Sequence, residues 1–145
     1  MVVEAGNAEK FLSVMFKLSN AMKSESEYCC KICGDLNEKE LFIIDFIGEN
    51  RNVKMSDIAD YLQSPLSTLT TIVDKLVTNK FLLRYNSVND RRVVNVELDQ
   101  KGKASYREFN KRKEIRAKNV LGNLSESEQE NLIANLAQLV TTIQL

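Results

Sequence analysis

The sequence predicts a mainly α-helical fold with one small β-sheet: six helices, with two strands between the fourth and the fifth. Three observations carry this prediction. Apolar residues recur at helical spacing over most of the 145 residues. The period changes to strict alternation only near residues 81–98. One proline and five glycines are too few for a fold made mostly of strands and turns.

The first helix is expected over residues 4–26. Its apolar face, which suits a core or an inter-subunit contact, is formed by Phe11, Met15, Leu18 and Met22. The second helix is expected to begin at Asn37, an N-cap with Glu40 three residues later as in a capping box. The apolar run up to Ile47 predicts burial on most sides, and Gly48 is expected to end the helix.

A short third helix is expected from Met55 to Leu62. Ser64 and Pro65 then predict the start of a fourth helix, with serine as the N-cap and proline at the first helical position. Its buried face is predicted to consist of Leu66, Leu69, Ile72, Val73, Leu76 and Val77. Its outward face consists of Ser67, Thr68, Thr71, Lys75 and Thr78.

Two strands are expected over residues 81–85 and 94–98, and apolar and polar side chains alternate in the second. The polar turn between them contains Asp90, Arg91 and Arg92. A strand pair with a basic tip, directly after a helix pair, predicts a β-wing. The chain is therefore predicted to be a winged helix-turn-helix protein.

A long fifth helix is expected over residues 101–122, and we interpret its many lysines and arginines as a solvated face. Ser125 and Glu128 form another capping box and predict a last helix over residues 126–143. The apolar stripe of that helix consists of Leu132, Leu136, Leu139 and Ile143.

Composition excludes several function classes. The chain has no histidine, which excludes Ser-His and Cys-His catalysis and imidazole metal sites. No glycine-rich phosphate loop is present, so we expect no enzymatic activity and no cofactor. Net charge is zero, but residues 51–92 carry seven bases against four acids, whereas residues 1–50 carry five bases against nine acids. The middle segment is the expected contact for an anionic partner.

The hydropathy pattern argues against a membrane protein. No apolar stretch approaches the ~18 residues of a membrane span. The N-terminal segment is amphipathic with interspersed charges, unlike a signal peptide. We therefore expect a cytoplasmic protein with no membrane partner.

Several short motifs occur in order over residues 55–102. They are the Ile-Ala pair at residues 58–59, the serine-rich start of the fourth helix, V-D-K-L at residues 73–76, D-x-R at residues 90–92, Leu98, and K-G at residues 101–102. With these motifs, the segment resembles the MarR (multiple-antibiotic-resistance regulator) family. In the order of elements and in length, the resemblance extends over nearly the whole chain.

The resemblance implies a single domain over residues 1–145, with a winged helix-turn-helix lobe at residues 36–102. Residues 1–35 and 103–145 would supply the helices of an intertwined homodimer, interlocked through the N- and C-terminal helices. Exposed apolar stripes on those helices favour a dimer independently. The two lobes would face successive major grooves of a pseudo-palindromic double-stranded DNA operator.

The DNA-binding residues that we expect are Ser64, Ser67, Thr68, Thr71, Lys75, Asp90, Arg91 and Arg92. Ser67, Thr68, Thr71 and Lys75 of the fourth helix would read the major groove. The two arginines would reach the minor groove, and Asp90 would orient an arginine. A small-molecule effector would occupy a crevice between the dimerisation helices and each lobe. Its expected lining, which core packing explains equally well, is Phe11, Met15, Phe42 and Phe46.

The sequence departs from the family pattern around the fourth helix. Lys80 stands where the family usually has glycine, and we expect Asn79 to take the left-handed cap instead. The arginine often seen near Thr71 is missing, so more of the affinity is expected from the wing.

Cys29, Cys30 and Cys33 are expected between the first two helices and are not a general feature of the family. In a reducing cytoplasm we expect no structural disulfide, and adjacent cysteines pair only with strain. Cys30-x-x-Cys33 has the spacing of a redox pair or of half a metal site. Buried or incidental thiols at a helix junction are the main interpretation, and a thiol redox sensor or a metal sensor is an open alternative.

The predicted function is a sequence-specific double-stranded DNA-binding transcriptional regulator, a repressor released by a small-molecule or redox signal. The other alternative is a winged-helix module that binds protein and has no DNA activity. Salt-dependent binding to duplex DNA separates the two, because phosphate contacts release counterions.

Overall fold

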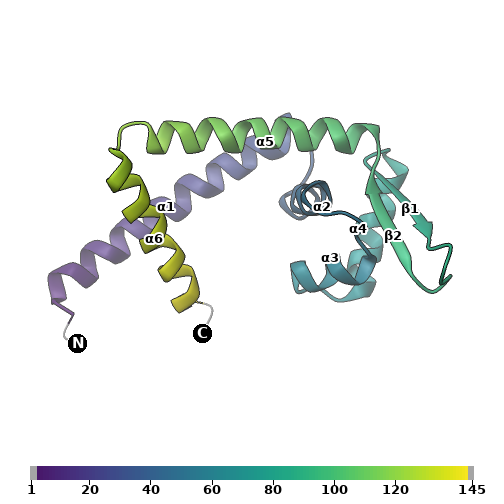
Figure 1. Cartoon of the computed structure of the whole chain (residues 1–145), viewed down its shortest axis with the longest axis horizontal. Coiled ribbons are helices and arrows are strands. Elements are labelled where there is room, and N and C mark those ends of the chain that lie inside the picture. The colour runs from purple at the N-terminus through teal and green to yellow at the C-terminus, as the bar shows by residue number, and fades with distance from the viewer. Residues whose placement is uncertain (1–2, 144–145) are drawn as a thin grey trace. The chain divides into compact units, whose positions relative to one another are not determined.

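The structure is a computed structural model that describes residues 3–143, so both ends of the predicted domain, residues 1–2 and 144–145, lie outside the description. The predicted six helices and two strands are confirmed (Figure 1). They are α1 (Ala5–Ile32), α2 (Glu38–Glu49), α3 (Met55–Leu62), α4 (Leu66–Thr78), β1 (Leu82–Asn86), β2 (Val94–Leu98), α5 (Gln100–Leu121) and α6 (Glu126–Ile143). Two compact units divide within α5, one up to Phe109 and one from Asn110 onward. The predicted division at residues 35/36 and 102/103 stays a prediction.

The core of the first unit lies between α2, α3, α4, the sheet and the last turns of α1. Its most deeply buried aliphatic side chains are Leu41, Ile43, Ile44, Ile58, Leu69, Val73, Leu76, Leu82 and Val96. In this core α4 packs on α3 and β1, while α2 packs on β2. The outward face of α4 is left uncovered as a result.

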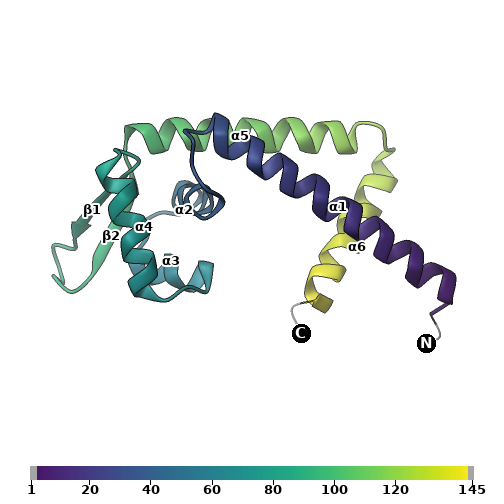
Figure 2. The ribbon, with the colours of Figure 1, turned by 180° about the vertical axis from the view of Figure 1, so that it is seen from behind.

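The two strands form an antiparallel ribbon that lies beside α4 in both ribbon views (Figures 1 and 2). Leu82 pairs with Leu98 at the base of the ribbon, and Asn86 pairs with Val94 near its tip. The backbone N–H of Val96 donates to the Val53 carbonyl at 2.9 Å. The base of the wing is therefore fixed to the segment between α2 and α3.

Both predicted capping boxes are confirmed. At the start of α2, the Glu40 N–H donates to Asn37 Oδ1, and the Asn37 N–H donates to Glu40 Oε2, each at 2.9 Å. At the start of α6, Ser125 and Glu128 exchange the same kind of bonds. The backbone N–H of Ser125 holds the pKa of the Glu128 carboxyl below its usual value.

Gly48 does not end α2, as the sequence had suggested. The helix continues to Glu49 because the Tyr106 ring of α5 occupies the space that a Cβ at Gly48 would need. The glycine thus permits the close approach of α5. The end of α2 comes at Asn50, whose side-chain amide donates to the Phe46 carbonyl at 2.8 Å.

The start of α4 also differs from the prediction. Ser64 is not the N-cap, because its hydroxyl donates back to the Leu62 carbonyl at 3.4 Å. Pro65 precedes the helix, and its carbonyl accepts the first helical bond from the Leu69 N–H. Leu66 was predicted to be buried and is 54% exposed, since the core contacts of α4 begin one turn later at Leu69.

At the end of α4, Lys80 takes the left-handed conformation and Asn79 does not, which corrects the prediction. The φ of Lys80 is +66°, and that of Asn79 is −86°. The N–H of Lys80 donates to the Val77 carbonyl, and the N–H of Phe81 donates to the Leu76 carbonyl. This pair of bonds is a Schellman motif, which requires positive φ at the second residue past the last helical residue, Thr78.

The first helix is longer than predicted. It ends at Ile32, so Cys29 and Cys30 belong to its last turn, and Cys33 caps it. The expectation that the cysteines lie between the helices is therefore wrong for Cys29 and Cys30 and correct for Cys33. The chain then turns at Gly34, whose φ is +123°.

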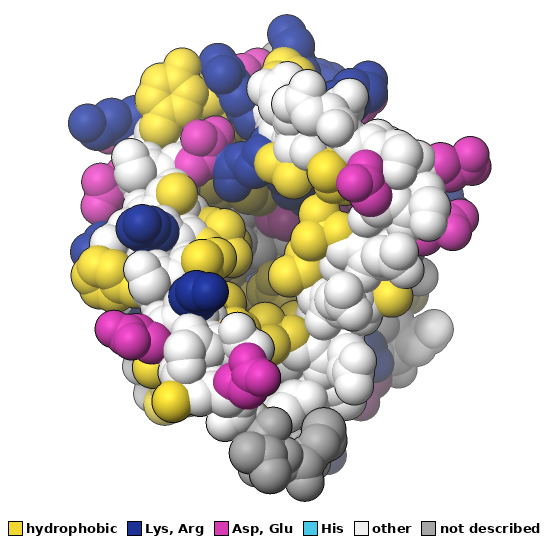
Figure 3. Space-filling view, turned by 90° about the vertical axis from the view of Figure 1, so that its left-hand side faces the viewer, with side chains coloured by type: hydrophobic (Ala, Val, Ile, Leu, Met, Phe, Trp, Pro, Cys, Tyr) yellow, Lys and Arg dark blue, Asp and Glu magenta, His cyan; other side chains and the backbone are white. Residues whose placement is uncertain are grey.

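Large apolar side chains stand uncovered on the terminal helices. On α1 they include Phe11, Leu12, Phe16 and Met22, with Phe16 70% exposed. On α6 no residue is buried, and Leu136 is 45% exposed. Figure 3 shows apolar side chains at the surface among charged ones. These faces remain without cover within a single chain.

Candidate nucleic-acid interface

The outward face of α4 is exposed as predicted. Helical spacing places Ser67, Thr71, Lys75 and Thr78 along one face, with Thr68 beside them, and all five are exposed. Leu69, Val73 and Leu76 hold the opposite face in the core. Ser64, the remaining candidate of this segment, is half-buried before the helix. The result is a firmly packed helix with a shallow polar surface.

Two of the three threonine hydroxyls on this surface, those of Thr71 and Thr78, donate to their own helix. Thr71 Oγ1 donates to the Ser67 carbonyl at 3.4 Å, and Thr78 Oγ1 donates to the Asp74 carbonyl at 2.9 Å. A hydroxyl has one hydrogen and two lone pairs. These oxygens therefore present acceptors outward, beside their methyl groups.

Lys75 is exposed as expected, and it also has an acidic partner that the sequence did not predict. Its Nζ lies 2.6 Å from Glu40 Oε1, which joins α4 to the first turn of α2. The Glu40 side chain is 3% exposed, whereas that of Lys75 is 61% exposed. The lysine thus contacts a buried carboxylate while most of its own side chain stays exposed.

The wing turn places both predicted arginines at the surface. Arg91 and Arg92 are exposed, and among the described residues neither side chain has a partner. The turn itself is well ordered by hydrogen bonds. The Asn86 side chain donates to the Arg91 carbonyl at 2.8 Å, and the Ser87 N–H donates to the Val93 carbonyl at 2.8 Å.

Asp90 acts on the backbone rather than on a guanidinium group. Its Oδ1 accepts the Arg92 N–H at 2.9 Å, and its carbonyl accepts the Val93 N–H at 3.0 Å. This is the side-chain-to-backbone turn that aspartate forms readily. The carboxylate therefore fixes the backbone from which the Arg92 side chain projects.

An ion pair connects α4 with the wing. Arg84 of β1 contacts Asp74 of α4 through its guanidinium group. Further along the ribbon, the Tyr85 hydroxyl donates to Glu97 Oε1, and this bond raises the pKa of Tyr85. The face of α4 and the wing thus belong to one connected scaffold.

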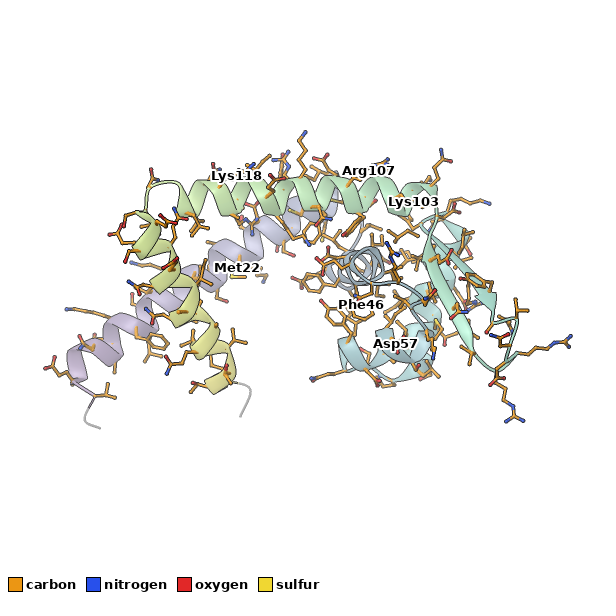
Figure 4. All side chains as sticks on the ribbon, viewed as in Figure 1. Met22, Phe46, Asp57, Lys103, Arg107 and Lys118 are labelled. Carbon is orange, nitrogen blue, oxygen red and sulfur yellow. The ribbon has the colours of Figure 1, made fainter. Side chains whose placement is uncertain are left out.

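The four residues expected to line an effector crevice do not gather within one chain. Phe42 and Phe46 lie on α2, where Phe46 stacks on Tyr61 of α3 at a centroid distance of 4.4 Å (Figure 4). The contact between α1 and α2 is made near Ser26 and Cys30. Phe11 and Met15 lie about 15–25 Å before that contact along α1, from the rise of 1.5 Å per residue.

All three cysteine side chains are buried in the core. Burial raises the pKa of the Cys30 thiol, and the nearby Glu38 carboxylate adds to the effect. A thiol that stays protonated is a poor nucleophile. Among residues 3–143, no three cysteine, histidine or acidic side chains gather as a metal site would require.

Sequence reasoning missed two participants, Glu40 and Asp74. Glu40 was explained fully by its capping role, and its second contact lies 35 residues away in sequence. Asp74 lies on the exposed face of α4, and its partner Arg84 is on a different element. The only available signal was the presence of unassigned opposite charges on elements expected to pack together.

The sequence of this segment is similar to a known family. Residues 36–94, which contain α2, α3, α4 and β1, match the sequence profile of the MarR family. The curated relatives of this chain in Bacillus subtilis (strain 168) include the HTH-type transcriptional repressor YetL, 25% identical over 138 residues that cover 94% of this chain and 82% of YetL. Another is the HTH-type transcriptional regulator YfiV, 26% identical over 110 residues that cover 76% of this chain and 69% of YfiV.

Solved structures support the same fold for this chain. Streptococcus pneumoniae FabT, in complex with DNA, matches with a TM-score of 0.81 and 25% identity, over 97% of this chain and 98% of FabT. The Staphylococcus aureus MepR–DNA complex matches with a TM-score of 0.72 and 21% identity, over 92% of this chain and 97% of MepR.

Among residues 3–143, no helix is long and apolar enough to span a membrane.

Proposed function

We propose that this chain is a MarR-family transcriptional repressor that binds a pseudo-palindromic DNA operator as a homodimer. One observation carries the proposal. A single scaffold presents an exposed helix face of short hydroxyl side chains together with two arginines that have no partner among the described residues. That combination suits a groove-reading helix with an adjacent basic wing.

Each part of this surface has a role in the proposed complex. The face of α4 with Thr71 lies against base edges in the major groove. The first turn of α4 has no side-chain cap, so its backbone N–H groups can donate to phosphate. Arg91 and Arg92 enter the minor groove, where negative potential attracts guanidinium groups.

Dimerisation supplies the cover that α1 and α6 lack. Exposed apolar stripes of this size are typical of interfaces. A symmetric pair of lobes then reads the two halves of a palindrome. An effector crevice lined by Phe11, Met15, Phe42 and Phe46 would have to combine side chains from two copies, because they do not gather in one.

We propose a small molecule as the releasing signal. The alternative redox signal requires an accessible thiolate, whereas the three cysteines are buried and the pKa of Cys30 is raised. A metal signal would require a ligand set that residues 3–143 do not assemble.

The experiment is a DNA-binding titration by fluorescence anisotropy. The probe is a duplex selected by the protein from a random-sequence pool, and a scrambled duplex is the control. Binding to the selected duplex should weaken steeply as salt rises, and sedimentation should show a dimer. A protein that binds neither duplex at low salt would contradict the proposal and favour the protein-binding alternative.

A further inference from the structure

We propose that Glu40 is a positioning residue that converts Lys75 from a phosphate-binding cation into a directed donor that reads guanine in the major groove. The inference rests on the proposed DNA-binding function. It assigns a role to a buried carboxylate that lies behind the recognition helix and is not itself part of the exposed surface.

The first step is the bonding of Glu40. Its Oε2 accepts the Asn37 N–H in the capping box, and its Oε1 lies 2.6 Å from Lys75 Nζ. Each carboxylate oxygen therefore has a partner on a different element. Glu40 also lies in the first turn of α2, at the N-terminal end of that helix. The carboxylate is a fixed anchor for whatever lies across it.

The second step concerns the charge that Lys75 offers to DNA. Lys75 is the only cationic residue of α4. Its ammonium is neutralised at close range by a carboxylate that is 3% exposed. An ammonium paired in this way neutralises little phosphate charge, so it displaces few of the cations condensed on DNA when DNA binds.

The third step concerns direction. A lysine ammonium has three N–H donors, and the contact with Glu40 uses one. An unpaired lysine is a flexible point charge, which suits phosphate and reads bases poorly. Here the tether removes much of that freedom while 61% of the side chain stays exposed. The remaining donors belong to a residue that shares a helix face with Thr71 and Thr78, the face proposed to lie against base edges.

These steps identify the base. In the major groove guanine presents two acceptors, O6 and N7, for which lysine is a standard partner. The neighbouring threonine hydroxyls donate inward and present acceptors, so they do not serve guanine. Lys75 is then the group of α4 that distinguishes a guanine from the other bases.

The test compares four proteins on a duplex selected by the unaltered protein and on its single-base-pair variants, over a salt series. In the unaltered background, Lys75→Met should leave the salt slope, the change of log affinity with log salt, unchanged. It should remove the preference for G·C at one base pair per half-site, a preference of about 5- to 150-fold. Glu40→Gln keeps an oxygen for the cap and frees the lysine. It should steepen the slope by about 0.9 per subunit and lower discrimination at the same pair. The double variant should return to the original slope.

Glu38→Gln is the matched control. It removes the same charge from the same first turn of α2, but its carboxylate accepts from Ser26 of α1. It should change neither slope nor discrimination. Circular dichroism melting checks that each variant is folded at the assay temperature. If Glu40→Gln is not folded, the result for Lys75→Met decides the question.

Two results would overturn the inference. If Lys75→Met flattens the salt slope by about 0.9 per subunit, the lysine already contacts phosphate. If folded Glu40→Gln changes neither slope nor discrimination, the pair is only structural. Failure of the unaltered protein to bind any duplex would instead overturn the proposed function itself, and with it any reading role for Lys75.

Discussion

The lobe formed by α2, α3, α4 and the two strands buries its apolar side chains within one chain, whereas α6 buries none of its own. Leu41, Ile58 and Leu69 in the lobe are fully buried. Ile133 and Val140 on α6 are more than half exposed. The lobe can therefore hold its shape alone, and the terminal helices need another surface. Folding of the reading surface and assembly of the protein are accordingly separate properties.

The largest expected effect is on assembly. Replacing Leu136 and Leu139 together by aspartate places charges on the stripe of α6, which should abolish the dimer and leave unfolded or aggregated protein. Sedimentation and concentration-dependent melting measure this, because dimer stability rises with protein concentration. A well-folded monomer that still binds DNA would show that α6 needs no partner.

The next effect tests the self-sufficiency of the lobe. Leu69→Ala removes a fully buried side chain from α4 and should lower the free energy of unfolding by about 2–5 kcal/mol. Leu66→Ala, three residues earlier on the same helix and 54% exposed, should change it by less than about 0.5 kcal/mol. Urea titrations measure both. Equal losses would mean that Leu66 is covered by a second subunit.

A change in the wing should alter DNA binding without altering folding or dimerisation. Arg92→Ala should weaken operator binding by about 1–3 kcal/mol and flatten the salt dependence by about one phosphate per subunit. Melting temperature and dimerisation should not change, because the side chain has no partner among the described residues. Lys39→Ala, an exposed cation on α2, is the control for a general loss of charge. Equal weakening by both variants would argue against a specific wing contact.

A smaller effect is expected at Asp90. Asp90→Ala loses the hydrogen bond to the Arg92 N–H and should weaken DNA binding by about 1 kcal/mol, although it removes a negative charge. Asp90→Asn keeps an accepting oxygen and should bind at least as tightly as the unaltered protein. Anisotropy titrations compare the three proteins. Tighter binding by Asp90→Ala would show that the carboxylate mainly repels phosphate.

The smallest effect should be a gain in lobe stability. Lys80 has a φ of +66°, which glycine adopts without the cost that a Cβ imposes. Lys80→Gly should raise the free energy of unfolding by about 1 kcal/mol. Asn79→Gly should not, because Asn79 already has a right-handed conformation. Chemical denaturation distinguishes them, and stabilisation by Asn79→Gly alone would contradict the observed cap.

Local signals in the sequence predicted most of the fold. The bounds of α6 and the capping boxes at Asn37 and Ser125 depend on residues within one turn of each other, and all are confirmed. Errors occurred where tertiary packing decides. Gly48 fits a helix end in sequence but lies beneath the Tyr106 ring, and the last turn of α1 is stabilised by a core that no local pattern reveals.

The candidate site was predictable in its surface and less so in its internal contacts. The exposed face of α4 and the arginines of the wing tip follow from helical spacing and from the turn between two strands. The partners of Lys75 and Asp90 do not. Lys75 meets a carboxylate 35 residues away, and Asp90 meets a backbone N–H where a guanidinium group was expected. Charge complementarity alone does not select between such partners.

The threonine hydroxyls of α4 bear on how many genomic sites one regulator of the proposed kind can serve. A threonine whose hydroxyl donates to its own helix offers DNA only an acceptor oxygen and a methyl group. Neither forms the bidentate contacts that discriminate strongly between bases. Most positions of a half-site would then tolerate substitution, while the guanine opposite Lys75 would not. Binding sites for such a surface share few invariant base pairs, so one protein can regulate a set of related promoters.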